Sequence, residues 1–136
     1  MKFRLLVPAL LGALVAAGPA SSSGSQVRLL TGSFKTVISG KSSNLDGTWV
    51  LKIDKLGQST ISKDGKLDVK GAVAAWLGHF QITDTSGPTA CKGVQASGAY
   101  TYTLKGNQLA LKVSFDQCSG RTSILTAHSL TKIADS

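Results

Sequence analysis

The stretch Tyr100-Thr-Tyr-Thr-Leu-Lys-Gly-Asn-Gln-Leu-Ala-Leu-Lys-Val-Ser-Phe115 decides the fold class. From Leu109 to Phe115, apolar residues alternate with Ala, Lys and Ser, which is the period of a strand with one buried face. Residues 100–104 alternate in the same way. Gly106-Asn107 lies between the two runs and is typical of a two-residue hairpin. The stretch therefore predicts two antiparallel strands joined by a tight turn.

The rest of the chain repeats this pattern of short alternating runs separated by Gly, Asn, Asp and Ser. Clear runs cover 48–53, 66–70 and 79–83, and weaker ones cover 27–30, 34–38, 59–62 and 122–132. Asp64-Gly65 predicts a second tight turn. Residues 73–77 leave a short helix and a bulged strand both open. We therefore predict an all-β protein, a single antiparallel up-and-down β-barrel of about eight strands, with a two-sheet sandwich as the alternative.

The N-terminus has the order of a secretory signal peptide. Lys2 and Arg4 precede an apolar run over residues 5–17, and Gly18-Pro19-Ala20 follows it. The run is shorter than the roughly 20 residues that a membrane-spanning helix needs. The sequence therefore predicts a signal peptide over 1–20, a polar segment with one or two weak strands over 21–46, and the barrel over 47–136. We expect a secreted protein, extracellular or periplasmic, without a transmembrane segment.

The charge is basic but dispersed. Fifteen Lys and Arg face seven acidic residues, all of them Asp, for a formal charge of +8. The lysines lie at alternate strand positions or in turns, whereas nucleic-acid binding calls for a clustered basic stripe with aromatic residues. We expect no nucleic-acid partner, and a role on anionic surfaces stays an alternative.

Cys91 and Cys118 are the only cysteines. In an exported small domain such a pair is most simply a disulfide, and a metal or redox pair is the alternative. Neither histidine has ligand spacing to a cysteine, so we expect no metal and no cofactor. No Gly-x-Ser-x-Gly element and no Glu is present to mark a hydrolase or a paired-carboxylate site.

The two histidines differ in strand phase. His79 alternates against Phe80 and Ile82, which indicates the solvent side. His128 shares a face with Leu130 and could point into a barrel, either as a structural residue or as a general acid or base.

Three motifs carry a resemblance to a known family. Gly47-Thr48-Trp49 opens a strand, Arg121 lies near the end of the chain, and the segments 84–91, 98–102 and 116–121 hold the cysteines and a Gly-x-Tyr-x-Tyr strand. This combination resembles the lipocalins and wider calycin barrels, and in particular the small lipocalin-like domains of exported microbial proteins. The resemblance implies that Trp49 closes the base of the barrel and that Arg121 lies across its indole ring.

The remaining aromatic residues suggest a ligand site. In a barrel, their alternation directs most of them inward, where they either fill the core or line a cavity. The residues expected to face one lumen and contact a ligand are Phe80, Tyr100, Tyr102, Leu111, Phe115 and His128.

Three functions fit these observations. The first is a secreted protein that binds a small apolar or amphipathic molecule in the barrel lumen. The second is a calycin or allene-oxide-cyclase-like enzyme, a cyclase, pericyclase, dehydratase or isomerase of secondary metabolism, with Tyr100, Tyr102 and His128 as its catalytic groups. The third is an exported inhibitor of a hydrolase that presents the loop 85–94.

Overall fold

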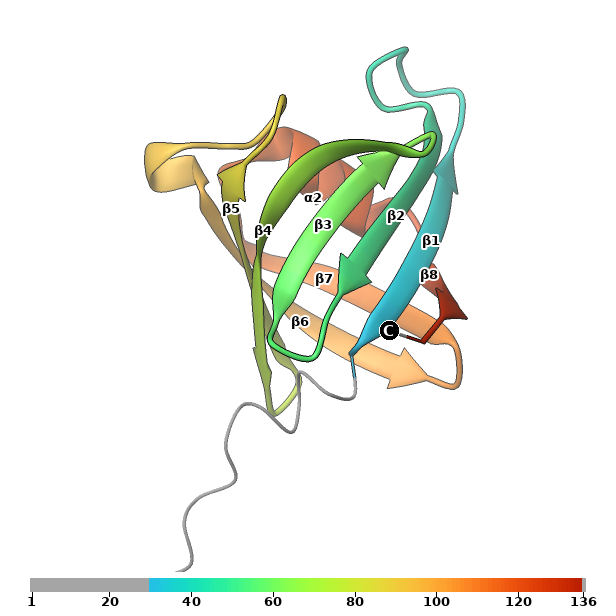
Figure 1. Cartoon of the computed structure of the whole chain (residues 1–136), viewed down its shortest axis with the longest axis vertical. Coiled ribbons are helices and arrows are strands. Elements are labelled where there is room, and N and C mark those ends of the chain that lie inside the picture. The colour runs from blue at the N-terminus through green and yellow to red at the C-terminus, as the bar shows by residue number, and fades with distance from the viewer. Residues whose placement is uncertain (1–29, 136) are drawn as a thin grey trace, which may run out of the picture.

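The computed structural model describes residues 30–135, and its eight strands form one closed antiparallel barrel in chain order (Figure 1). The prediction of an all-β, up-and-down barrel is confirmed, and the architecture is consistent with a lipocalin-like fold. The predicted signal peptide lies outside the described residues. The elements are β1 (Gly32–Ile38), β2 (Gly47–Ile53), β3 (Gln58–Lys63), β4 (Lys66–Trp76), β5 (His79–Ser86), η1 (Gly93–Gln95), β6 (Ser97–Lys105), β7 (Gln108–Phe115), α2 (Ser119–Thr126) and β8 (Leu130–Ala134).

Both predicted tight turns are present. Asp64 and Gly65 join β3 to β4, and both have positive φ angles, 50° and 80°. This conformation gives the primed turn whose twist matches that of the flanking strands. Gly106 and Asn107 join β6 to β7 in the same two-residue manner. The open question at 73–77 resolves as strand, because β4 continues to Trp76 before a further two-residue turn.

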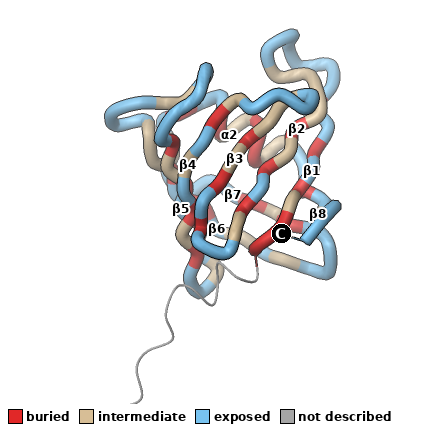
Figure 2. Tube along the Cα trace, viewed as in Figure 1, coloured by how far each residue is buried: buried red, intermediate tan, exposed pale blue. Residues whose placement is uncertain are grey.

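The barrel begins with β1 at Gly32, earlier in the chain than the predicted start at residue 47. β1 pairs along its whole length with β2, so Trp49 lies in the second strand rather than the first. Buried and exposed residues alternate along β1 and β2, which places one face of each strand in the core (Figure 2). Phe34, Leu51 and Ile53 are among the side chains that fill the interior.

The predicted strand over 122–132 is wrong for most of its length. Residues 119–126 form α2, and only the five residues of β8 are extended. The buried residues of α2 are Arg121, Ile124 and Leu125, which is a helical spacing rather than an alternating one. The hydroxyls of Thr122 and Thr126 donate to carbonyls four residues earlier, which satisfies these polar groups within the helix.

Only a few residue pairs close the barrel at β8. β8 forms two residue pairs with β7 and three with β1. β7 also carries an irregularity, since Ala99 pairs with Phe115 while the next residue, Tyr100, pairs with Val113. Ser114 is therefore an extra residue, a β-bulge, and it reverses the direction of the residues that follow it.

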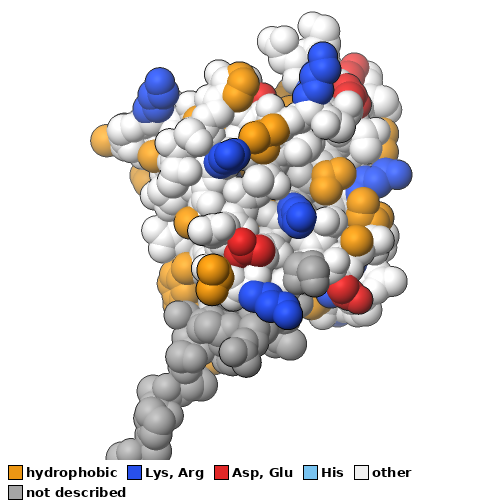
Figure 3. Space-filling view, in the orientation of Figure 1, with side chains coloured by type: hydrophobic (Ala, Val, Ile, Leu, Met, Phe, Trp, Pro, Cys, Tyr) orange, Lys and Arg blue, Asp and Glu red, His pale blue; other side chains and the backbone are white. Residues whose placement is uncertain are grey.

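The surface agrees with the dispersed charge of the sequence. On the face shown in Figure 3, the Lys and Arg side chains are separated from one another by neutral surface. Within residues 30–135, no helix has the length and apolar character needed to span a membrane.

Candidate functional site

A cavity of about 610 Å³ lies at the end of the barrel formed by the β1–β2 loop, the β3–β4 turn, the β5–β6 loop and the start of α2. Its apolar wall consists of Leu45, Trp49, Ile61, Val69 and Ile124. Its polar and charged wall consists of Asn44, Lys63, Asp68, Asp84, Thr89, Gln95, Ser119 and Arg121, together with Gly120 and the two cysteines. One side of the cavity can therefore hold apolar groups while the other supplies hydrogen bonds and charge.

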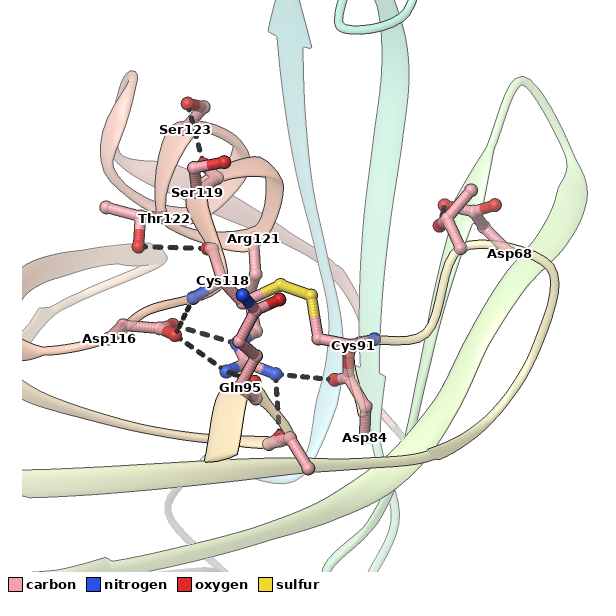
Figure 4. Close-up of a disulfide and its surroundings, with 12 residues drawn as sticks. Asp68, Asp84, Cys91, Gln95, Asp116, Cys118, Ser119, Arg121, Thr122 and Ser123 are labelled. Atoms are coloured by element: carbon pink, nitrogen blue, oxygen red, sulfur yellow. Dashed lines mark hydrogen bonds and ion pairs between the residues drawn. A yellow bond between two sulfur atoms is a disulfide. The ribbon is translucent and has the colours of Figure 1, made fainter. Parts of the chain in front are cut away.

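The predicted disulfide closes one side of this cavity. Cys91 and Cys118 are bonded, with their Cα atoms 6.1 Å apart, so the loop after β5 is tied to the residue that precedes α2 (Figure 4). The backbone N–H of Cys91 also donates to Asp84 Oδ2 at 2.8 Å. The crosslink and this hydrogen bond fix the loop against the end of β5.

A buried ionic cluster lies behind the disulfide. Arg121 is 4% exposed, and its guanidinium Nη1 lies 2.9 Å from Asp84 Oδ1. Its Nε and Nη2 donate to the two oxygens of Asp116 at 2.8 and 2.7 Å. The carbonyls of Gln95 and Ala96 accept the remaining N–H groups at 2.9 and 2.8 Å.

A guanidinium carries five N–H donors, and Arg121 makes four hydrogen bonds together with the ion pair to Asp84 Oδ1. Arg121 therefore joins the end of β5, the residue that follows β7 and the η1 segment to the start of α2. Figure 4 shows its contacts with Asp84 and Asp116 converging on the guanidinium from two sides.

Tyr100 and Gly98 complete this cluster. The Tyr100 hydroxyl donates to Asp116 Oδ2, and burial, followed by this hydrogen bond, raises the pKa of the phenol well above its usual range. Burial alone would raise the pKa of Asp116, but hydrogen bonds from Arg121, Tyr100 and the Cys118 N–H hold it below its ordinary value. A Cβ atom at Gly98 would lie 2.3 Å from Asp116 Oδ2, so only glycine leaves room for this carboxylate.

Trp49 borders the cavity and anchors the β1–β2 loop. Its Nε1 donates to the Leu45 carbonyl at 2.7 Å. The cation over its ring is Lys63, with Nζ 5.6 Å from the centroid, and Lys63 also donates to the carbonyls of Ser43 and Asn44. The resemblance implies Arg121 in this position, but the carboxylates of the buried cluster engage that residue instead.

The same loop is organised by one carboxylate. Asp46 accepts hydrogen bonds from the backbone N–H groups of Gly40, Lys41 and Ser42 at 3.2, 2.9 and 3.2 Å. The bond from Lys41 is the largest of the effects that hold the pKa of Asp46 below its usual value. The loop that carries Leu45 to the cavity therefore has a defined shape when Asp46 is ionised.

The residues expected to line one lumen lie in three different places. Phe80, Tyr100 and Leu111 are buried in the core, and the rings of Phe80 and Tyr100 meet edge to face with centroids 6.1 Å apart. Tyr102 is half-buried. None of these four borders the cavity.

Phe115 and His128 lie farther from the expected arrangement. Phe115 is 62% exposed, because the bulge at Ser114 places it opposite Ala99 on the outer face. His128 is exposed in the segment between α2 and β8 and borders a different, shallower cleft. For Phe115, the structure differs from the alternation because a single inserted residue reverses the phase of a strand, and for His128 because α2 and the segment after it replace the predicted strand.

The sequence analysis named Trp49, Arg121 and the two cysteines, but it missed the other residues that form the cavity. Ile61 lies in the weaker run 59–62 and Val69 in the clear run 66–70, and the two residues pair across β3 and β4 at buried positions. The signal for Asp84 and Asp116 was their presence in the two segments that also hold the cysteines. A disulfide between these segments brings their acidic residues close to each other and to Arg121.

Comparisons of the chain with models of known families, with curated proteins and with solved structures found no match.

Proposed function

We propose that this protein is an exported, lipocalin-like carrier that holds a small apolar or amphipathic molecule in the cavity at one end of its barrel. The observation that carries the proposal is the size and wall of that cavity. Its volume of about 610 Å³ lies within the range of roughly 300–1,000 Å³ that is typical of small-molecule sites. The N-terminal signal pattern and the disulfide support export.

The wall indicates how such a ligand would lie. Trp49, Ile61 and Val69 offer a continuous apolar side, since they occupy neighbouring strands of the barrel. Lys63 and Asp68 supply opposite charges on the wall of the same cavity. An amphipathic molecule would therefore place its apolar part against the strands and its polar part toward these charged groups.

The experiment measures binding of a neutral apolar dye, Nile red, to the protein and to two matched variants. Val69→Phe fills the cavity from its apolar wall, whereas Val113→Phe adds the same volume at an exposed position on β7 that does not border the cavity. We expect one dye per chain and an affinity loss of roughly tenfold or more in Val69→Phe, equivalent to about 1.4 kcal/mol. The Val113→Phe variant should bind as the unmodified protein does.

A third variant separates this site from the lumen expected from alternation. Phe115→Ala should leave the affinity unchanged, because that ring lies on the outer face. Equal binding by Val69→Phe and the unmodified protein would contradict the proposal. Absence of any dye or fatty acid binding would also contradict it and would leave the loop 85–94, with its exposed Val94, as the remaining feature suited to contact a partner.

A further inference from the structure

The charges on the wall of the cavity at the end of the barrel do not balance. The charged side chains that border it are Lys63, Asp68, Asp84 and Arg121. Arg121 and Asp84 belong to the buried ionic cluster, in which a single guanidinium meets two carboxylates, those of Asp84 and Asp116. When both carboxylates are ionised, the cluster keeps one negative charge in excess at the cavity wall.

Lys63, the other cation of the wall, is already engaged by the β1–β2 loop. Its Nζ donates to the carbonyls of Ser43 and Asn44 at 3.1 and 3.0 Å and lies 5.6 Å from the centroid of the Trp49 ring. An ammonium group has three N–H donors, so two of those on Lys63 are used within the protein. An anionic ligand would have to compete with these contacts for the ammonium.

Asp68 is the charged group of the wall that lacks a counter-ion. The pairing of β3 with β4 shifts between Ile61 and Ser62, because Asp68 is an extra residue in β4, a β-bulge. Its side chain borders the cavity, and Thr89 Oγ1 donates to its Oδ2 at 2.5 Å. No cation within residues 30–135 forms an ion pair with it, and in Figure 4 it lies apart from the ionic cluster.

The cavity therefore has the opposite charge to the whole chain. Lys63 offsets only one of the two uncompensated negative charges, that of Asp68 or that of the cluster, whereas the chain has a formal charge of +8. The other lysines are dispersed over exposed positions, where salt screens their charge over about 8 Å at physiological ionic strength. Inside a cleft with apolar walls the local charge acts more strongly, and here it favours a cation.

We propose that the ligand of this cavity is a cationic amphiphile, an organic amine with a short hydrocarbon chain. The inference rests on the proposed function, because it assigns the charge of the molecule held in the same cavity. The ammonium group would pair with Asp68, and the side-chain amide oxygens of Asn44 and Gln95, which border the cavity, are further acceptors for its N–H groups. The hydrocarbon chain would lie against Ile61 and Val69 on β3 and β4.

The test measures displacement of Nile red at pH 7 by octylamine and octanoate, which share a chain length and carry opposite charges at this pH. We expect octylamine to bind at least about fivefold more tightly than octanoate, the ratio that a partly exposed ion pair provides. Val69→Phe should weaken both ligands, because it fills the space that their chains would share. Binding of Nile red with an equal or greater affinity for octanoate would overturn this inference and leave the proposed function intact, whereas absence of Nile red binding would contradict both.

A matched pair of variants then assigns the charge to Asp68. Asp68→Asn keeps an acceptor for Thr89 and removes the charge, so it should weaken octylamine binding about three- to fivefold without changing the affinity for the neutral dye. Asp135→Asn makes the same change in net charge at a side chain that is 93% exposed and outside the cavity, and it should have no effect. Unchanged octylamine affinity in Asp68→Asn, or an equal loss of octylamine and Nile red binding, would overturn the assignment, because the first excludes the ion pair and the second indicates a structural role.

Discussion

Replacement of Arg121 by Met tests the buried ionic cluster that this residue forms with Asp84 and Asp116. The substitution keeps much of the side-chain length but removes the charge and all five N–H donors. Two carboxylates would remain, and the side chains of Asp84 and Asp116 are only 3% and 0% exposed. The desolvation of these carboxylates would no longer be compensated, because no other cation within residues 30–135 pairs with either of them.

The expected magnitude follows from this burial. Removing one partner of a buried ion pair costs about 3–5 kcal/mol, against a total stability of roughly 5–15 kcal/mol for a domain. Arg121→Met should therefore lower the free energy of unfolding by about 3–5 kcal/mol at pH 7. Urea denaturation followed by circular dichroism measures this change, and Lys112→Met, at an exposed position on β7, should change it by less than about 0.5 kcal/mol.

The pH dependence gives a second readout with a definite sign. In the unmodified protein the pKa of Asp116 is lowered, so its contribution is complete above the ordinary value of 3.8 and is lost as the pH falls through the folded-state pKa. In Arg121→Met, burial without the cation would raise the pKa of the same carboxyl, and protonation between pH 7 and 4 would recover stability. The two stability curves should therefore converge as the pH falls.

A loss of less than about 1 kcal/mol at pH 7, or a difference that does not change with pH, would refute this reasoning. If Arg121→Met fails to fold, Asp84→Asn provides the measurement, because Asp116 still pairs with the guanidinium through both oxygens. Loss of that single charged contact should cost about 1.5–3 kcal/mol.

Two further predictions concern the loops around the cavity. Replacement of both Cys91 and Cys118 by Ala should lower the free energy of unfolding by about 3.6 kcal/mol, the chain-entropy value for a sequence separation of 27, and an unchanged urea midpoint would contradict it. Because the pKa of Asp46 is lowered, the order of the β1–β2 loop should persist above pH 3.8 and be lost as the pH falls through the folded-state value. NMR titration of the three amide protons that Asp46 accepts should show a shared midpoint below 3.8, and Asp46→Asn should remove that transition.

The sequence by itself determined the local structure of this protein. Alternation over Leu109 to Phe115 and the turn residues at Asp64-Gly65 and Gly106-Asn107 predicted strands and hairpins, because side-chain period and turn conformation depend on neighbouring residues. The disulfide was also predicted correctly, because the chain has only two cysteines and they could pair only with each other.

Only the tertiary structure decided which residues meet. The bulge at Ser114 arises from the pairing of β7 with β6, and it moved Phe115 from the expected lumen to the surface. α2 forms where alternation suggested a strand, and it buries Arg121 against Asp84 and Asp116, which come from two other segments of the chain. The position of the cavity also depends on how the strands pair over long distances in the sequence. The side-chain period shows which residues of a strand share a face, but it does not show which strand pairs with it. One inserted residue then exchanges the two faces.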